Sequence, residues 1–150
     1  MYRSGLLTFT MPAASEALPA GTNVAVGATV AAVSSQFSDA FAASNAVDGD
    51  PVTEWSSAGN GDAAFIEIDL GRVVQAVAVG FLTREMSDGS SVTTTFSVTV
   101  DGEQTFGPFP AGAGTGSAPV RFMGRVVRFD VEPSTGGNTG AAEVEVYEPS

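Results

Sequence analysis

Residues 45–55 hold the side chains best placed to do chemistry. Asp48 and Asp50 flank Gly49, and the hydroxyl of Thr53 follows three residues later. Such a loop can curl so that side-chain and backbone oxygens converge, which suits a hard cation that takes about six to eight oxygen ligands. Asp-Gly-Asp also commonly forms an Asx turn without any metal. The segment alone leaves both interpretations open.

Several residue types are missing from the chain, and their absence limits the catalytic and metal-binding chemistry that it can perform. The 150 residues include no His, no Cys and no Lys, and all six basic residues are Arg. This excludes a Ser-His-Asp triad, a thiol nucleophile, Schiff-base chemistry, and the usual Cys and His ligands of zinc, iron–sulfur clusters and haem. Carboxylates, carbonyls and hydroxyls remain, and calcium is a metal that prefers these oxygens.

A glycosidase is the enzymatic alternative that survives, because it needs only two carboxylates about 5–9.5 Å apart across a cleft. Glu54, Asp62, Glu85 and Asp88 supply acids, but their spacing singles out no pair. We therefore expect a protein that is not an enzyme.

The chain is strongly acidic, with 17 Asp and Glu residues, a net charge of −11 and a pI of about 4.1. Phosphate backbones and anionic lipids are bound mainly through basic residues, so we expect neither a nucleic-acid partner nor membrane insertion. No apolar run approaches the roughly 18 residues of a membrane-spanning helix. Residues 1–20 do not form a convincing signal peptide, and we expect an extracellular or particle-surface location.

Apolar and polar residues alternate with a period of two along most of the chain, which predicts an all-β fold. The run Phe65–Leu70 alternates and stops at Gly71, and Val73–Leu82 is a longer apolar run typical of a central strand. Asp101-Gly102 predicts a hairpin turn because both residues tolerate positive φ. Seven or eight short strands indicate an antiparallel β-sandwich or jelly roll; the other candidates are 23–33, 93–100, 106–109, 125–131 and 143–147.

Helix is expected only around residues 38–46, where Ser38 is in position to cap one or two turns. The glycine-rich segments 111–117 and 134–140 are predicted to be flexible loops. The length suits one domain. We place this domain at residues 23–150 and an N-terminal arm or attachment segment at residues 1–22.

Four motifs occur in an order that resembles the discoidin, or coagulation factor V/VIII type C, domain of the galactose-binding superfamily, which includes the family-32 carbohydrate-binding modules. The similarity spans about residues 23–148, and the pairing of Asp-Gly-x-x-x-Thr-x-Trp with Ala-Glu-x-x-Val-Tyr is fairly specific. The motifs are Asn23-Val-Ala-Val-Gly-Ala-Thr-Val, Ala46-Val-Asp-Gly-Asp-Pro-Val-Thr-Glu-Trp-Ser-Ser57, Ile66-Glu-Ile-Asp-Leu-Gly71 and Ala142-Glu-Val-Glu-Val-Tyr147.

The resemblance implies an antiparallel jelly-roll sandwich with a structural Ca²⁺ where the Asp-Gly loop meets the final strand. It also implies that Trp55 packs against the core below this loop, although a lone Trp can be a sugar-stacking platform instead. The implied calcium ligands are the Asn45 carbonyl, the Asp48 carboxylate, the Asp50 carbonyl, Thr53 through carbonyl and hydroxyl, the Ala142 carbonyl and the Glu143 carboxylate.

Sugar-binding members of the family carry an Arg in the loop after the central strand, and the resemblance places Arg84 there. Glu85 and Asp88 are expected to accept hydrogen bonds from sugar hydroxyls, with Phe37 or Phe41 as the stacking aromatic. Arg84 and Glu85 forming a solvated surface pair is the alternative. The chain departs from the galactose-binding pattern because it has no His and has Ser90-Ser91 where an Asn is expected.

We therefore expect a non-catalytic, lectin-like module that binds a glycan or polysaccharide. Its expected setting is adhesion to cell-surface or capsular glycan, as part of a larger assembly such as a bacterial surface complex or a phage-like particle. The alternative from a different class is a structural sandwich without sugar binding. In either case the N-terminal arm is the candidate contact with a protein partner.

Overall fold

The computed structural model describes residues 21–50, 52–84, 91–111, 118–132 and 134–149, and this part of the chain is mainly antiparallel β-structure, as predicted. Eight strands and three short 3-10 helices follow one another. They are β1 (Gly21–Asn23), β2 (Thr29–Val33), η1 (Asp39–Phe41), η2 (Ala43–Val47), β3 (Trp55–Ser56), η3 (Gly61–Ala63), β4 (Phe65–Thr83), β5 (Thr95–Val100), β6 (Gln104–Pro110), β7 (Ala118–Val131) and β8 (Gly140–Pro149).

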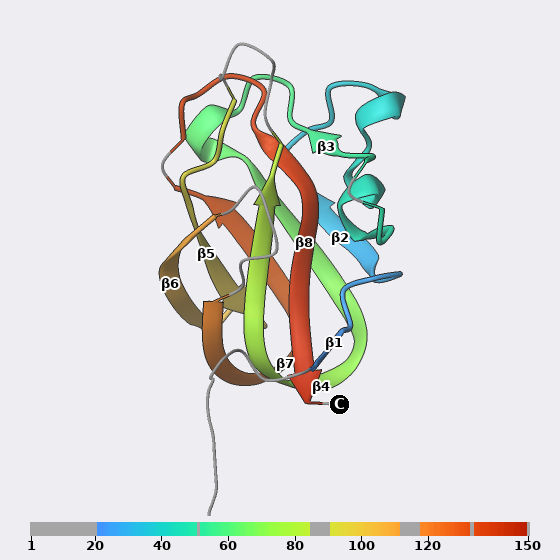
Figure 1. The fold of residues 1–150 in the computed structure, drawn as a ribbon, viewed down its shortest axis with the longest axis vertical. Helices are drawn as coiled ribbons and strands as arrows, with labels where there is room; N and C mark the ends of the chain where they lie inside the picture. Colours follow the sequence, from blue (N-terminus) through green and yellow to red (C-terminus); the bar gives the residue numbers. More distant parts are fainter. Residues whose placement is uncertain (1–20, 51, 85–90, 112–117, 133, 150) are drawn as a thin grey trace, which may run out of the picture.

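The strands form one antiparallel sheet in the order β1-β8-β4-β7-β5-β6, with β2 added to β4 and β3 added to β8. The long strands β4 and β7 stay paired from Phe65–Asp130 to Val79–Ala118. Both curve strongly at the lower end of Figure 1, so the sheet folds over on itself and its two halves enclose a core. The predicted antiparallel jelly-roll sandwich is confirmed.

The prediction that a strand stops at Gly71 is wrong, because β4 runs on from Phe65 to Thr83. Gly71 has a φ of +85°, which glycine adopts without a steric penalty. Its N–H donates to Asp69 Oδ1 at 2.8 Å, and the β4–β7 register shifts between Asp69 and Val74. The glycine is therefore a bend inside one strand, and it lets the strand pass from one layer of the sandwich to the other.

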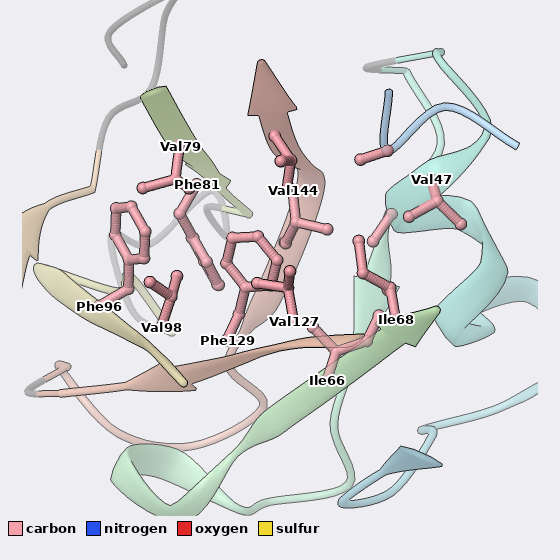
Figure 2. Close-up of a cluster of buried hydrophobic side chains, with 14 of the residues drawn as sticks. Val47, Ile66, Ile68, Val79, Phe81, Phe96, Val98, Val127, Phe129 and Val144 are labelled. Carbon is pink, nitrogen blue, oxygen red and sulfur yellow. The ribbon is translucent and has the colours of Figure 1, made fainter. Parts of the chain in front are cut away.

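The core lies between the two halves of the folded sheet. Ile66 and Ile68 come from the first half of β4, and Val79 and Phe81 come from its second half; all four are almost completely buried (Figure 2). Phe96 stacks on Phe81 with ring centres 5.4 Å apart. Each of these side chains contributes about 1.5–3 kcal/mol to the free energy of unfolding through its burial, so the apolar face of each alternating strand favours this packing of the two halves.

The Asp101-Gly102 hairpin is confirmed, since the two residues have φ values of 53° and 69°. The segment predicted as one capped helix is instead split into η1 and η2. The prediction that Ser38 caps it is wrong, because the Ser38 side chain makes no capping hydrogen bond. Other side chains hold the segment instead, since Gln36 Oε1 accepts from the Ala43 N–H at 2.7 Å and the Asn45 amide donates to the Ala40 carbonyl at 3.0 Å.

The described sheet begins at Gly21, because Gly21 and Thr22 already pair with Pro149 and Glu148 of β8. The rest of the proposed N-terminal arm, residues 1–20, lies outside the described residues. No helix in the described ranges is long and apolar enough to cross a membrane.

Gly140 is predicted to be intolerant of any side chain. A Cβ atom at this position would lie 2.0 Å from the backbone oxygen of Trp55, where β3 pairs with β8. Gly140→Ala should therefore lower the free energy of unfolding by about 1–3 kcal/mol through overpacking, measured by chemical denaturation. At Gly102 a Cβ would meet nothing within 4 Å, so Gly102→Ala should show only the backbone cost of a positive φ, about 1 kcal/mol. Equal losses in the two variants would contradict the steric explanation.

Candidate functional site

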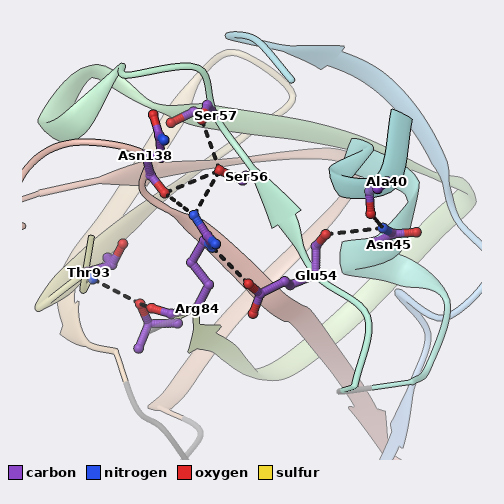
Figure 3. A network of polar contacts seen from close by, with 9 residues as sticks. Ala40, Asn45, Glu54, Ser56, Ser57, Arg84, Thr93 and Asn138 are labelled. Carbon is purple, nitrogen blue, oxygen red and sulfur yellow. Dashed lines mark hydrogen bonds and ion pairs between the residues drawn. The ribbon is translucent and has the colours of Figure 1, made fainter. Parts of the chain in front are cut away.

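Arg84 directly follows the last residue of β4, and its side chain is only 9% exposed. Its Nε donates to Glu54 Oε1 at 2.9 Å, and its Nη1 donates to Ser56 Oγ at 2.9 Å and to the Asn138 carbonyl at 2.7 Å (Figure 3). These bonds fix the plane of the guanidinium. Arg84 is thus buried rather than solvated, and Glu54 is a carboxylate partner that balances its charge.

A cavity of about 150 Å³ opens beside Arg84, between Phe37, Phe41, Ser56 and Asn138. The Phe37 and Phe41 rings meet edge to face with centres 5.9 Å apart. Arg84 Cζ lies 5.3 Å from the centre of the Phe41 ring, within cation–π range. Phe37 is 55% exposed. The cavity thus combines an accessible aromatic surface with a fixed polar wall, which suits a ring that has one apolar face and polar edges.

Four segments far apart in the sequence build this cavity. Phe37 is positioned by its N–H, which donates to the Ser56 carbonyl at 2.7 Å. Asn138 lies in segment 134–140, which was predicted to be flexible. Instead it is tied to its surroundings: Gly61 N–H donates to the Gly137 carbonyl and Ser57 N–H to the Thr139 carbonyl, each at 2.8 Å. These backbone bonds are what place Asn138 against Arg84.

The structure brings two of the predicted ligand-binding residues together, since Phe37 and Arg84 line the same cavity. Glu85 and Asp88 lie outside the described residues. Sequence reasoning missed Ser56 and Asn138 as lining residues and Glu54 as the partner of Arg84. Ser56 belongs to one of the family motifs, but no local pattern indicates that a residue 28 positions later binds it.

A second group of polar side chains surrounds the Asp48 loop. Asp48 Oδ1 accepts from the Asp50 N–H at 2.9 Å, and Asp48 Oδ2 accepts from the Thr53 hydroxyl. The Thr53 hydroxyl also lies 3.0 Å from the Asp50 carbonyl. Burial acts to raise the pKa of Asp48, but hydrogen bonds from Thr53, Asp50 and Glu143 outweigh it and lower this pKa below its usual range. The Asx turn is therefore present, and it brings the Asp48 carboxylate, the Thr53 hydroxyl and the Asp50 carbonyl together.

Glu143 reaches this loop from β8. Its side chain is almost fully buried, and its Oε1 accepts from the N–H of Gly49, which is 94 residues away in the sequence. Its Oε2 is buried without a hydrogen-bond partner in the described part of the chain. Burial, together with the neighbouring carboxylate of Asp48, raises the pKa of Glu143 to about 8. Two carboxylates thus face each other with one oxygen left unsatisfied.

The family model of the F5/8 type C domain matches residues 30–146. The chain belongs to this family. No curated protein matches the sequence. Chitosan-binding module 1 from the chitosanase/glucanase of Paenibacillus sp. IK-5 is 25% identical in sequence, with a TM-score of 0.63 over 84% of this chain and 98% of that one.

Other solved structures share the fold of this F5/8 type C domain at lower identity. The family-32 carbohydrate-binding module of Clostridium perfringens NanJ, in complex with galactose, is 18% identical with a TM-score of 0.64, over 81% of this chain and 93% of that one. The lectin domain of lectinolysin, complexed with Lewis B antigen, is 23% identical with a TM-score of 0.61, over 86% of this chain and 98% of that one. At these identities the likeness shows the fold.

The remaining residues of the implied calcium set lie on both sides of the junction between the Asp48 loop and β8. Asn45 is in η2, and its side-chain amide donates to the carbonyls of Ala40 and Glu54 at 3.0 and 3.1 Å. Ala142 is an extra residue in β8, because Ala141 pairs with Thr83 while Glu143 pairs with Leu82. A bulge of this kind leaves one residue out of the regular ladder, and here it lies next to Glu143.

The junction of this F5/8 type C domain fits a hard cation. Its donors are carboxylate, hydroxyl and carbonyl oxygens, which calcium prefers, and Glu143 Oε2 is a buried acceptor without a donor. No group of three acidic side chains suited to a metal occurs among the described residues. Asp48 and Glu143 would therefore hold the ion together with neutral oxygens.

The raised pKa of Glu143 predicts a pH dependence of the metal-free domain. A carboxyl with a folded-state pKa of about 8 and an unfolded value of 4.5 stabilises the fold fully below about pH 4.5, and this stability is lost as pH rises through 8. In EDTA, the melting temperature should fall between pH 6 and about pH 9. Glu143→Gln should reduce this fall, because its amide donates to Asp48 at every pH. Part of the slope should remain, since burial also raises the pKa of Glu145.

Glu148→Gln serves as the control, because the pKa of Glu148 is lowered by its hydrogen bond with Arg72. That variant should keep the full fall in melting temperature over the alkaline range. A metal-free wild-type domain whose melting temperature does not change over this range would contradict the assignment.

Proposed function

We propose that this domain is a non-catalytic carbohydrate-binding module that takes one sugar unit in the cavity beside Arg84. The observation that carries the proposal is the joint lining of this cavity by the exposed Phe37 ring and the immobilised Arg84 fork. A pyranose has an apolar face of C–H groups and a rim of hydroxyls. The ring of Phe37 would cover the face, while Arg84 and Ser56 are placed beside the rim.

The pairing of Arg84 with Glu54 limits what this cavity selects. Because the ion pair leaves little net charge behind the cavity, an anionic sugar gains no strong attraction there, and recognition rests on hydrogen bonds and stacking. The 25% identity to a chitosan-binding module supports a carbohydrate ligand of neutral or cationic character.

A binding role agrees with the chemistry of the cavity better than glycoside hydrolysis does. Hydrolysis needs an acid and a second carboxylate at a defined separation across the sugar. The described lining residues of the cavity include no carboxylate, and Glu54 is engaged by Arg84 Nε. We therefore propose that bound glycan is released unchanged.

We propose that a structural Ca²⁺ joins the Asp48 loop to β8, held by Asp48 and Glu143 with the carbonyls of Asn45, Asp50 and Ala142 and with Thr53. The buried, unpartnered oxygen of Glu143 supports this assignment. The ion would link two segments about 95 residues apart in a chain without cysteine. Closing so long a loop costs chain entropy, and the binding of the ion would offset that cost.

We propose further that the domain is an adhesion module, which attaches a larger assembly to cell-surface or capsular glycan outside the cell or on a particle surface. The related chitosan-binding module is itself derived from a larger enzyme. The segment ahead of β1 is the natural point of attachment, since β1 lies at the edge of the sheet.

Calcium should stabilise the domain. At a calcium concentration about one hundredfold above Kd, the gain is about 2.7 kcal/mol, which raises the melting temperature by about 5–10 °C over the EDTA-treated protein. Differential scanning calorimetry measures this rise. Asp48→Ala should abolish the response to calcium, whereas Asp39→Asn, at an exposed position on η1, should keep it. A melting temperature that is the same in EDTA and in calcium would refute the calcium site.

Phe37→Ala should weaken glycan binding about tenfold, because it removes the apolar contact with the sugar face. Screening on a glycan array, with and without calcium, identifies a ligand, and isothermal titration calorimetry then gives the affinity. Met123→Ala is the control, since Met123 is 66% exposed and lies outside this cavity. If no glycan binds, the protein is a structural sandwich and the proposal fails.

A further inference from the structure

A second hollow of the described surface shares no lining residue with the Arg84 cavity. It is a groove of about 620 Å³ over the outer face of β5, β6 and β7, with Asp62 of η3 at one end. This volume is in the range of about 300–1,000 Å³ that ligand sites occupy. Its polar lining residues are Asp62, Ser97, Thr99, Thr105, Asp130 and Glu132.

The strand register aligns hydroxyl groups across this groove. Ser97 and Thr99 point outward from β5, because the alternate residues Phe96 and Val98 are buried in the core. Thr99 pairs with Thr105 of β6, and their hydroxyl oxygens are 3.0 Å apart. Each hydroxyl can donate once and accept twice, so a row of side chains across two strands can exchange hydrogen bonds with the hydroxyls of a sugar chain.

One hydroxyl of this row is held in place. Ser97, which is 5% exposed, donates its hydroxyl to Glu132 Oε2 at 2.6 Å. The hydroxyl and the carboxylate are thus oriented together at the groove that both line.

Carboxylates are spaced along the groove instead of converging on one point. Asp62 accepts from the Ser134 N–H at 2.9 Å, and Asp130 pairs with Arg128 at 3.1 Å. A carboxylate offers about four acceptor positions, so each retains free capacity. The groove therefore offers several separate carboxylate acceptors to a ligand that carries more than one positive charge.

The nearby aromatic ring does not serve as a platform for this groove. Phe65 of β4 is covered by Arg128, whose Cζ lies 3.8 Å from the ring centre. None of the lining residues of the groove is aromatic. Recognition here would rest on charge and hydrogen bonds, unlike the stacking against Phe37 in the Arg84 cavity.

We propose that this groove is a second carbohydrate site, which binds a chain of amino-sugar units carrying free, protonated amines. The hydroxyl row meets the sugar hydroxyls, and Asp62, Asp130 and Glu132 meet ammonium groups on the chain. The site lies on a different face from the Arg84 cavity and does not depend on the function proposed there.

The test is an NMR titration of the isotopically labelled full chain with a glucosamine tetramer at about pH 6. The fully N-acetylated tetramer, which has no amine charge, is the matched ligand. The glucosamine tetramer should shift the backbone amide signals of Ser97, Thr99 and Thr105, and the acetylated one should leave them in place. Glu132→Gln keeps an acceptor for Ser97 and should weaken binding about 3- to 5-fold.

Glu148→Gln is the charge-matched control, because Glu148 lies on β8, three strands away from β5 in the sheet, and it should not change the affinity. The proposal is overturned if the groove signals do not shift, if both tetramers shift them equally, or if the two variants weaken binding alike. Shifts confined to residues around Phe37 would also overturn it while supporting the Arg84 cavity. Shifts confined to the groove would support it while counting against that cavity.

Discussion

The buried guanidinium of Arg84 is the constraint on which the upper end of the sandwich depends. A charge removed from water must be paired and hydrogen-bonded, and removing one partner of such a buried pair typically costs about 3–5 kcal/mol. Arg84 meets this demand with a carboxylate from Glu54, a hydroxyl from Ser56 and a carbonyl from Asn138. Two segments, residues 54–56 and the one that holds Asn138, are thereby fixed against the end of β4, and both border the cavity.

At the Asp48 loop the charge that needs a partner is negative. Asp48 and Glu143 bring two negative groups together, and nothing in the described chain supplies a positive one to Glu143 Oε2. One answer is a proton, as the raised pKa of Glu143 indicates; the other is a cation. Trp55, which is fully buried, and Ser56, which lines the Arg84 cavity, directly follow this loop in the sequence.

Local periodicity predicted an antiparallel all-β sandwich or jelly roll, including the strand Phe65–Leu70, because each alternating strand has one apolar face to bury. The residue types of Asp101-Gly102 predicted the hairpin, and the family resemblance implied the buried Trp55, whose Nε1 donates to the Ser35 carbonyl at 2.9 Å. Periodicity failed at Gly71, where a glycine that looks like a strand end is a bend within β4.

The candidate site was predictable only in part. Arg84 and Phe37 were reached through the resemblance, but their contacts depend on segments 28 and 54 residues away from Arg84. Asn138 lies in a stretch whose composition suggests flexibility, and only tertiary hydrogen bonds hold it. No local pattern encodes such contacts, so neither the ion pair with Glu54 nor the groove over β5 could be derived from the residues alone.

The charge distribution links the two sites. The described residues include five arginines, and four of them are committed to ion pairs with Glu148, Glu54, Asp69 and Asp130. The cations are thus largely neutralised in place, whereas carboxylates such as Asp62 and Glu132 face the groove without an ion pair. An approaching ligand meets a negative field at a range of about 8–10 Å in physiological salt. Such a field would repel uronic and sialic acids and attract amino sugars, which is the selectivity that the proposed groove site requires.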